Sequence, residues 1–129
     1  MVCSFADDIY DIAEVLASQD DVEVVEIKDY IKNPKPNGYS SYHMIIKVPI
    51  YLYDVKELIP IELQIRTIAM DFWASLEHKM KYKKSLDEAP QIIKELKECA
   101  DSISDMDKKM LEIRKNIENM NISQDNSNY

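Results

Sequence analysis

The sequence has 129 residues, with 16 lysine and arginine residues against 24 aspartate and glutamate residues, a formal net charge of −8. This length predicts one small domain with one modest core. The acidic balance argues against a nucleic-acid partner, because backbone binding depends on clustered lysine and arginine. No apolar run approaches the roughly 20 residues of a membrane span. We therefore expect a cytoplasmic protein without a membrane partner, and we expect Cys3 and Cys99 to be buried free thiols because no ligand pattern accompanies them.

The first part of the chain predicts a short strand, a helix and a second strand. The apolar stretch "VCSF" starts this part, and Ser4 and Asp7 follow in capping-box spacing. An apolar stripe at helical spacing then continues to about residue 19. The stretch "DVEVVEIKDY" is rich in valine and alternates, which predicts a strand from Val22 to Lys28.

The loop 31–43, "IKNPKPNGYSSYH", contains the only glycine and two of the five prolines. Asn37-Gly38 favours a tight turn, and the prolines stiffen the chain around it. The loop offers two aromatic faces and two ammonium groups, from Tyr39, Tyr42, Lys32 and Lys35. Such a loop could stack a nucleobase, at roughly 1 to 3 kcal/mol per stack, and hold phosphates. The alternative is a rigid connection whose tyrosines simply pack down.

Two further strands are predicted after this loop. The stretch 43–52, "HMIIKVPIYL", is almost continuously apolar and predicts a central strand covered on both faces. The stretch 59–67 alternates, and its polar row contains Glu62, Gln64 and Arg66. A carboxylate beside an amide and a guanidinium could coordinate Mg²⁺ and orient a hydroxyl. An ordinary solvated face, and a half-buried structural role for His43, remain the alternatives.

Two helices are predicted in the last part of the chain. Thr67 can cap the first, whose expected inward stripe is Ala69, Phe72, Trp73, Leu76 and Met80, with Glu77 and His78 on the solvent side. Pro90 fits the first turn of the second. Along this long helix the apolar residues form a heptad seam, namely Ile92, Leu96, Cys99, Ile103, Met106, Met110, Ile113, Ile117 and Met120. Such a seam is expected to pack against another helix, either within the core or in an oligomer.

Together the elements predict an α+β fold, with a mixed sheet of about four to five strands, flanking helices and a long C-terminal helix. From these elements we divide the chain into two parts. Residues 1–84 carry the candidate site, and residues 85–120 form the long helix, which serves packing or oligomerisation. The polar, aperiodic residues 121–129 predict a disordered tail.

Two stretches also carry a family resemblance. "VEVVEIKDYIKNPKPNGYSSYHMIIKVPIYL" and "IPIELQIRTIAMDFWASLEHKMKYKK" closely resemble the RelA/SpoT synthetase domain, in particular the small alarmone synthetases, over most of Val2–Lys84. The resemblance implies a nucleotidyltransferase-like synthetase fold. It implies a GTP diphosphokinase that transfers pyrophosphate from ATP to the 3′-hydroxyl of GTP or GDP, with Mg²⁺, giving (p)ppGpp. Residues 1–84 would be its acceptor, GTP-binding part.

The resemblance also implies residue roles. Tyr39 would stack on guanine, and Lys35, Asn37 and His43 would contact the acceptor nucleotide. Glu62 would be the essential carboxylate, which holds Mg²⁺ or draws the proton from the 3′-hydroxyl. Gln64 and Arg66 would line the same pocket. Phosphoryl transfer suits such a site, since its catalysis is mostly positioning and charge neutralisation.

The sequence departs from the family pattern in two places. Family members carry a basic helix and a second metal-binding aspartate before the first strand, and no residue here can be assigned to either role. Ser40 stands where many small synthetases have a basic residue. We therefore expect a truncated synthetase with weak or no synthesis, forming a homo-oligomer, since resembling proteins are tetramers. The alternative is a non-catalytic fragment that binds guanine nucleotide or oligomerises.

Overall fold

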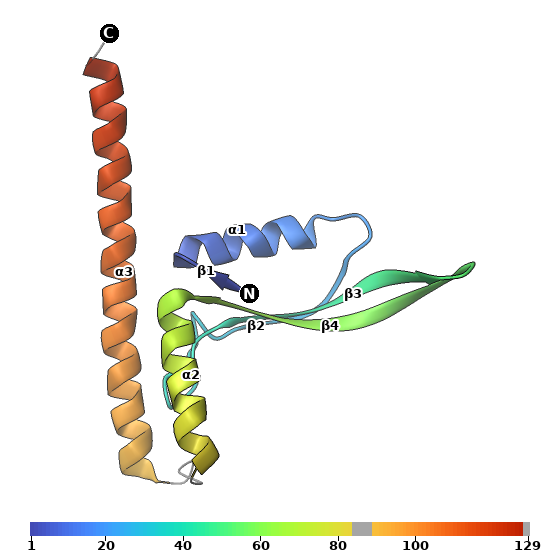
Figure 1. Ribbon diagram of the computed structural model, residues 1–129, viewed down its shortest axis with the longest axis horizontal. Coiled ribbons are helices and arrows are strands. Elements are labelled where there is room, and N and C mark those ends of the chain that lie inside the picture. Colours follow the sequence, from blue (N-terminus) through green and yellow to red (C-terminus); the bar gives the residue numbers. More distant parts are fainter. Residues whose placement is uncertain (84–88, 128–129) are drawn as a thin grey trace.

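The computed structural model describes residues 1–83 and 89–127, with side chains for 1–81 and 89–121 (Figure 1). The expected α+β class is confirmed. In chain order the elements are β1 (Val2–Cys3), α1 (Ala6–Ala17), β2 (Glu23–Asp29), β3 (Tyr42–Leu52), β4 (Val55–Thr67), α2 (Ile68–Lys83) and α3 (Pro90–Ser127). Among the described residues, no helix is both long and apolar enough to cross a membrane.

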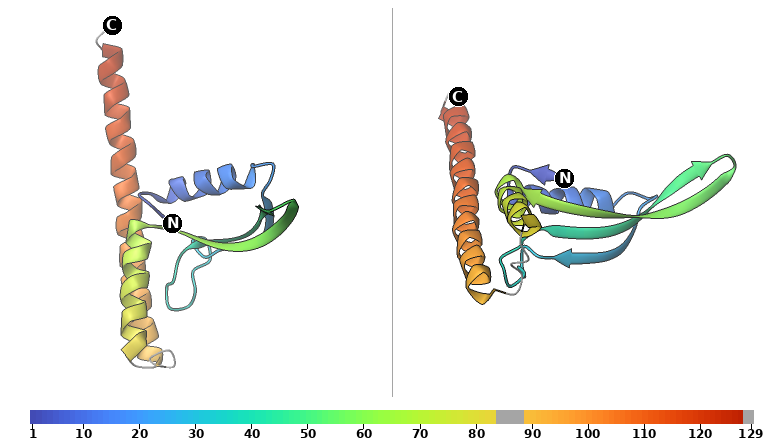
Figure 2. Two further views of the ribbon diagram at one scale, coloured as in Figure 1. Left: turned by 45° about the vertical axis from the view of Figure 1, so that its right-hand side comes forward. Right: turned by 60° about the horizontal axis from the view of Figure 1, so that its bottom comes forward.

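The four strands form one mixed sheet in the order β1-β4-β3-β2. β1 pairs parallel to β4, and the other neighbours pair antiparallel. A bulge between Val24 and Glu26 shifts the register of the edge strand β2. α1 runs along one face of the sheet, whereas α2 and α3 stand side by side at one end (Figures 1 and 2). The opposite face of the sheet carries no helix in these views.

The core lies between α1 and one face of the sheet. Met44 and Ile46 of β3 alternate toward α1 and pack with Ile9 and Ile65, and all four are at most 3% exposed. On the other face of β3, His43, Ile45, Lys47 and Pro49 are only half-buried, and Tyr51 is exposed. β3 is central as expected, but the expectation that it is covered on both faces is wrong, since α1 covers only one.

β3 and β4 form a hairpin longer than the sequence predicted. The pairing extends to Leu52 opposite Val55, so β4 begins before residue 59. Tyr53 occupies the turn with φ 57°, a left-handed conformation that side chains other than glycine rarely adopt. The turn therefore lacks the glycine or asparagine that marks a hairpin in sequence. The hairpin projects away from the helices (Figure 1), and its tip is exposed.

α2 begins directly after the cap predicted at Thr67, whose Oγ1 accepts a hydrogen bond from the Met70 N–H at 3.1 Å. The expected inward stripe is only partly correct. Trp73 is buried, but Phe72, Leu76 and Met80 are all at least 43% exposed. Glu77, expected in solvent, is buried and pairs with Lys81. The reason is that α2 is wedged between the 30–41 loop and α3, so its buried face is rotated toward the loop.

α3 is the long helix expected from Pro90, and it continues to Ser127. Its helical backbone therefore replaces the predicted disordered tail as far as Ser127, and residues 128–129 lie outside the described part. Ile92, Leu96 and Ile103 are half-buried and pack inward, as the heptad seam predicted. The rest of the seam is solvent-facing, namely Cys99, Met106, Met110, Ile113, Ile117 and Met120. Beyond Ile103 the half-buried residues of the helix are Asp107, Leu111 and Arg114, which lie between the positions of the seam. The expectation that Cys99 is buried is wrong, whereas Cys3 is buried as expected.

One polar contact ties α3 to α1. The Arg114 guanidinium donates a hydrogen bond to the Asp7 carboxylate and lies 4.4 Å from the centre of the Phe5 ring. The expected Ser4–Asp7 capping box is wrong, because α1 is capped at Phe5, whose N–H donates to Asp8 at 3.2 Å. Asp7 is therefore available for the contact with α3.

The 30–41 loop is fixed at its turn. The Gly38 N–H donates to the Lys35 carbonyl at 2.8 Å, and the Tyr39 N–H donates to Asn37 Oδ1 at 3.0 Å. Gly38 has φ +97°, and a Cβ there would lie 2.3 Å from the Cβ of Ala100 on α3. The only glycine of the chain is therefore required both by the turn and by the close approach of α3.

We predict that Gly38→Ala lowers the free energy of unfolding by about 2 to 4 kcal/mol, from backbone strain and overpacking against Ala100. Chemical denaturation measures this loss. In a double-mutant cycle, Ala100→Gly should restore the steric part and leave the backbone part. Additive losses for the two variants would contradict the close approach.

The contact between Asp7 and Arg114 predicts a pH dependence. The hydrogen bond from Arg114 lowers the pKa of the Asp7 carboxyl below its ordinary value of 3.8, although burial opposes the shift. This stabilisation is complete above pH 3.8 and is lost as the pH falls through the lowered pKa. Arg114→Met should remove it, as measured by denaturation at several pH values. Lys109→Met, at an exposed pair on the same helix, should leave the profile unchanged.

Candidate functional site

The open face of the sheet carries the polar row that the alternation of β4 predicted. Glu62 lies opposite Ile45 and Gln64 lies opposite His43 on the neighbouring strand β3. Arg66 follows at the end of the row, next to α2. Because the core uses the other face of both strands, all of these polar side chains stand on the side away from α1.

Arg66 is the hub of this row. Its Nη2 donates to Gln64 Oε1 and to the Tyr39 hydroxyl, both at 2.7 Å, and its Nη1 donates to Asp71 Oδ1 at 3.3 Å. The side chain is only 21% exposed. A planar guanidinium can make these contacts in fixed directions. Arg66 therefore joins β4, α2 and the 30–41 loop.

The Tyr39 hydroxyl has three hydrogen-bonding neighbours. It accepts from Arg66 Nη2 and, at 3.1 Å, from the Ser41 hydroxyl, and it lies 3.1 Å from His43 Nε2. A hydroxyl has one proton, so with two donors already present it donates to His43 Nε2. This count places the proton of neutral His43 on Nδ1, which lies 3.8 Å from Glu62 Oε1. Tyr39 and Glu62 therefore lie on the same side of the sheet.

An aromatic cluster holds the Tyr39 ring. The ring lies edge-on to Tyr30 and His43, with centroids 6.1 and 5.9 Å away, and 6.4 Å from Trp73. The Lys35 ammonium lies 5.2 Å from the ring centre. Tyr42, in contrast, is 8% exposed and packs in the core beside Tyr10. Of the two tyrosines expected to offer an aromatic face, only Tyr39 stands at the site.

Two polar cavities adjoin this cluster. One, of about 270 Å³, is lined by Tyr39, Arg66, Ala74, Ser75, Glu77 and His78. The other, of about 230 Å³, is lined by Glu26, Lys28, Tyr30, Lys35, His43, Ile45 and Glu62. Several of these lining residues were not predicted from the sequence. One is Lys28, whose position opposite His43 depends on the pairing of β2 with β3. His78 was expected to be an ordinary surface residue. It is exposed, and it lines the cavity beside Tyr39.

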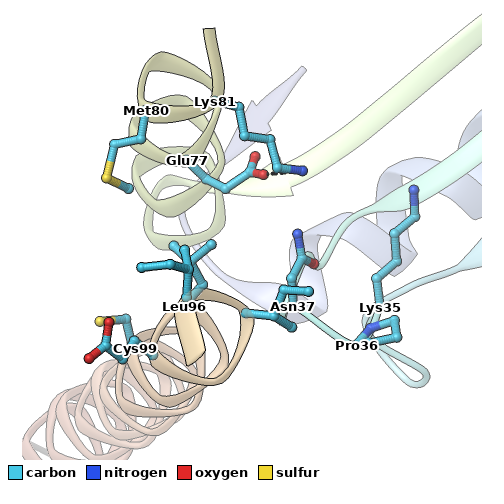
Figure 3. Close-up of a pocket in the computed structure, with 11 residues that line it drawn as sticks. Lys35, Pro36, Asn37, Glu77, Met80, Lys81, Leu96 and Cys99 are labelled. Atoms are coloured by element: carbon cyan, nitrogen blue, oxygen red, sulfur yellow. Dashed lines mark ion pairs between the residues drawn. The ribbon is translucent and has the colours of Figure 1, made fainter. Parts of the chain in front are cut away.

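Asn37 is the one predicted site residue that lies apart from Glu62. It lines a larger, mainly apolar cavity of about 540 Å³ between the 30–41 loop, α2 and α3 (Figure 3). Its side-chain oxygen accepts from the Tyr39 N–H at 3.0 Å, so its visible role is to shape the loop. Glu77 lines both this apolar cavity and the one beside Tyr39.

The charges of the site act on His43. Burial lowers the pKa of its imidazole below the ordinary value of 6.5, Glu62 raises it, and the cations of Lys35, Arg66 and Lys28 lower it further. Near neutral pH His43 is therefore neutral, which agrees with the proton count above. Positive charge from the lysines and Arg66 surrounds the sheet face, although the whole chain is acidic.

Glu62 is placed to take a hard cation. Its side chain is 60% exposed, so its carboxylate has room for an ion and solvent. Its Oε1 lies 3.8 Å from His43 Nδ1. Mg²⁺ commonly keeps several waters and binds one or two carboxylates plus substrate phosphates. Glu62 could supply one such carboxylate. In the described part of the chain, no three acidic, histidine or cysteine side chains form a complete metal cluster.

A carboxylate, a half-buried arginine, lysines and a tyrosine thus converge on one face of the sheet. The chain belongs to the RelA/SpoT family, because residues 1–87 match the family model described as "Region found in RelA / SpoT proteins". The resemblance of the sequence is thereby confirmed.

Named relatives are GTP pyrophosphokinases. The chain is 50% identical over 118 residues to GTP pyrophosphokinase YwaC of Bacillus subtilis, covering 92% of this chain and 56% of the relative. It is 37% identical to GTP pyrophosphokinase YjbM of the same organism, covering 88% and 54%. The chain therefore spans about half the length of these curated relatives.

Solved structures agree with the fold. The crystal structure of small alarmone synthetase 2 from Bacillus subtilis has a TM-score of 0.84 and 51% identity, covering 90% of this chain and 63% of that one. Small alarmone synthetase 1 from the same organism, bound to its product pppGpp, has a TM-score of 0.83 and 36% identity, covering 90% and 60%.

We predict that NMR titration of the His43 ring gives a pKa below 6.5. Two variants should move it in opposite directions. Glu62→Gln removes a negative charge and should lower the pKa further, whereas Lys35→Met removes a positive charge and should raise it. Shifts of the same sign in both variants would contradict the arrangement of these charges around His43.

Proposed function

We propose that this part of the RelA/SpoT region binds the acceptor nucleotide, GTP or GDP, in a GTP diphosphokinase. The reaction would transfer pyrophosphate from ATP to the 3′-hydroxyl of the acceptor and give (p)ppGpp. The observation that carries the proposal is the convergence of Tyr39, Arg66, His43 and Glu62 on one face of the sheet. Hydrogen bonds join Tyr39 to Arg66 and His43, and His43 Nδ1 lies 3.8 Å from Glu62 Oε1. The relatives named as GTP pyrophosphokinases support it.

The two polar cavities suggest how the nucleotide would lie. Guanine would stack on Tyr39 in the cavity shared with Arg66, and the phosphates would lie in the cavity lined by Lys28, Lys35 and His43. Tyr39 borders the first cavity and touches His43 of the second, so one nucleotide could span both. Lysines around a phosphate chain replace the counterions that it loses on binding.

Glu62 would act in the cavity that it lines with His43 and Lys35. It would hold Mg²⁺ or accept the proton of the 3′-hydroxyl, and a positioned base contributes roughly 10²- to 10⁴-fold in rate. Mg²⁺, when bound, would neutralise charge on the transferred phosphates. Gln64 would keep Arg66 in place by accepting from its guanidinium. Ser41 and Arg66 would hold the Tyr39 hydroxyl and keep its ring from turning.

A second candidate is a non-catalytic guanine-nucleotide-binding or oligomerising fragment. The exposed apolar seam of α3 favours it, since Met106, Met110 and Ile117 are each more than 50% exposed. Exposed stripes of this kind promote association. Light scattering tests this candidate, and a monomer at high concentration would weigh against the oligomer that we propose.

We predict that GTP binding changes the fluorescence of Trp73, the only tryptophan of the chain, because its ring centre lies 6.4 Å from that of Tyr39. Tyr39→Leu should weaken GTP roughly 5- to 100-fold, since a base stack is worth about 1 to 3 kcal/mol. Tyr51→Leu, at an exposed tyrosine of the hairpin, is the matched control and should bind normally. Equal GTP affinity of the unaltered chain, Tyr39→Leu and Tyr51→Leu would show that Tyr39 does not contact the nucleotide.

We expect little or no pentaphosphate when the chain is incubated with ATP, GTP and Mg²⁺, because the contacts proposed above hold the acceptor nucleotide and assign no described residue to ATP. Separation of the nucleotides measures the product. Robust synthesis that Glu62→Gln abolishes would overturn this limited role and support a complete synthetase. Absence of both synthesis and GTP binding would leave only the oligomerising candidate.

A further inference from the structure

α3 contacts the corner at which β4 passes into α2. Thr67, at this corner, is 0% exposed. Its hydroxyl donates to Asp107 Oδ2 of α3 at 2.7 Å and accepts from the Met70 N–H at 3.1 Å. Because a hydroxyl has a single proton, Asp107 is the one acceptor that fixes its direction. The same hydroxyl thus caps α2 and anchors the corner to α3.

This corner carries both ends of an ion pair in the candidate site. Arg66 directly precedes Thr67, and Asp71 directly follows Met70. Arg66 Nη1 lies 3.3 Å from Asp71 Oδ1. A shift of the corner would move these two side chains relative to each other. It would also move the Arg66 guanidinium away from the Tyr39 hydroxyl.

Apolar packing around the anchor is incomplete. A cavity of about 140 Å³ adjoins Asp107 and is also lined by Ser40, Met70 and Trp73. Side-chain packing therefore leaves a space on one side of Asp107, whereas Thr67 is fully buried. The Asp107 carboxylate also lies at the N-terminus of α2, where the helix dipole favours negative charge. The two hydrogen bonds of the buried Thr67 hydroxyl therefore link the position of the corner to Asp107.

We propose that Asp107 is a positioning residue for the nucleotide site, acting through Thr67 on Arg66. The effect of Asp107 on GTP affinity rests on the proposed acceptor function. Its effect on the position of Arg66 does not. Asp107 lies outside residues 1–87, the part that the family model matches. The long helix α3 therefore completes the site from beyond the family region.

The first test is NMR of the nucleotide-free chain. Asp107→Ala should shift the Arg66 Nε–H, Tyr39 ring and His43 ring signals, and Asp107→Asn, which keeps an acceptor oxygen, should restore most of them. Asp105→Ala makes the same change at an exposed position of α3 and should leave them in place. A lower melting temperature for Asp107→Ala with unchanged Arg66 signals would overturn the proposal.

The second test is GTP affinity, measured by calorimetry on the same variants. Asp107→Ala should weaken GTP about tenfold, the loss expected for a hydrogen bond to a charged group, and Asp107→Asn should recover most of the affinity. Normal affinity in Asp107→Ala would contradict the proposal. If the unaltered chain bound no GTP, the proposed function would fail, and the NMR shifts would still decide the role of Asp107.

If Asp107→Ala does not fold, a second pair of variants tests the same hydrogen bond from the Thr67 side. Thr67→Val keeps the shape of the side chain and removes its hydroxyl, whereas Thr67→Ser keeps the hydroxyl. The Arg66 signals should move in the first variant and stay in the second. Identical signals in both would overturn the proposal.

Discussion

The hydrogen bond from the Arg66 guanidinium to the Tyr39 hydroxyl joins the sheet to the loop that closes over it. The other contacts of the site follow from this bond. It sets the direction in which the Tyr39 proton points, toward His43, and it leaves the His43 proton facing Glu62. A planar side chain that is nearly buried can hold such a chain of contacts because it has few alternative positions.

The long helix contributes to this site without supplying any of the polar groups that line its two cavities. It packs along α2, where the Trp73 Nε1–H donates to the Leu96 carbonyl at 3.1 Å. It also touches the turn of the loop through Ala100, the strand corner through Asp107 and α1 through Arg114. Each meets a different element, so α3 fixes the relative positions of segments that are far apart in the sequence.

The sequence predicted the elements and most of the site because both rest on local pattern. The alternation along β4 placed Glu62, Gln64 and Arg66 on one face, and the strand pairing then brought His43 beside them. The family resemblance supplied roles that periodicity could not. Prediction failed where a tertiary contact overrides a local preference. Glu77 is an example, since an acidic residue in a lysine-rich helix is expected in solvent and is instead buried between two cavities. The seam of α3 is another, because the face of this helix that packs on the body continues through Asp107, Leu111 and Arg114 and not through the heptad positions.

The bulge in β2 has a consequence for the edge of the sheet. An edge strand offers unpaired backbone groups to strands of other molecules, and Val25 and Ile27 are 51% and 47% exposed on this one. The shift between Val24 and Glu26 interrupts the regular spacing of those groups. A chain arriving from another molecule would find no continuous ladder to join, so the irregular strand protects the protein against fibrous aggregation along this border.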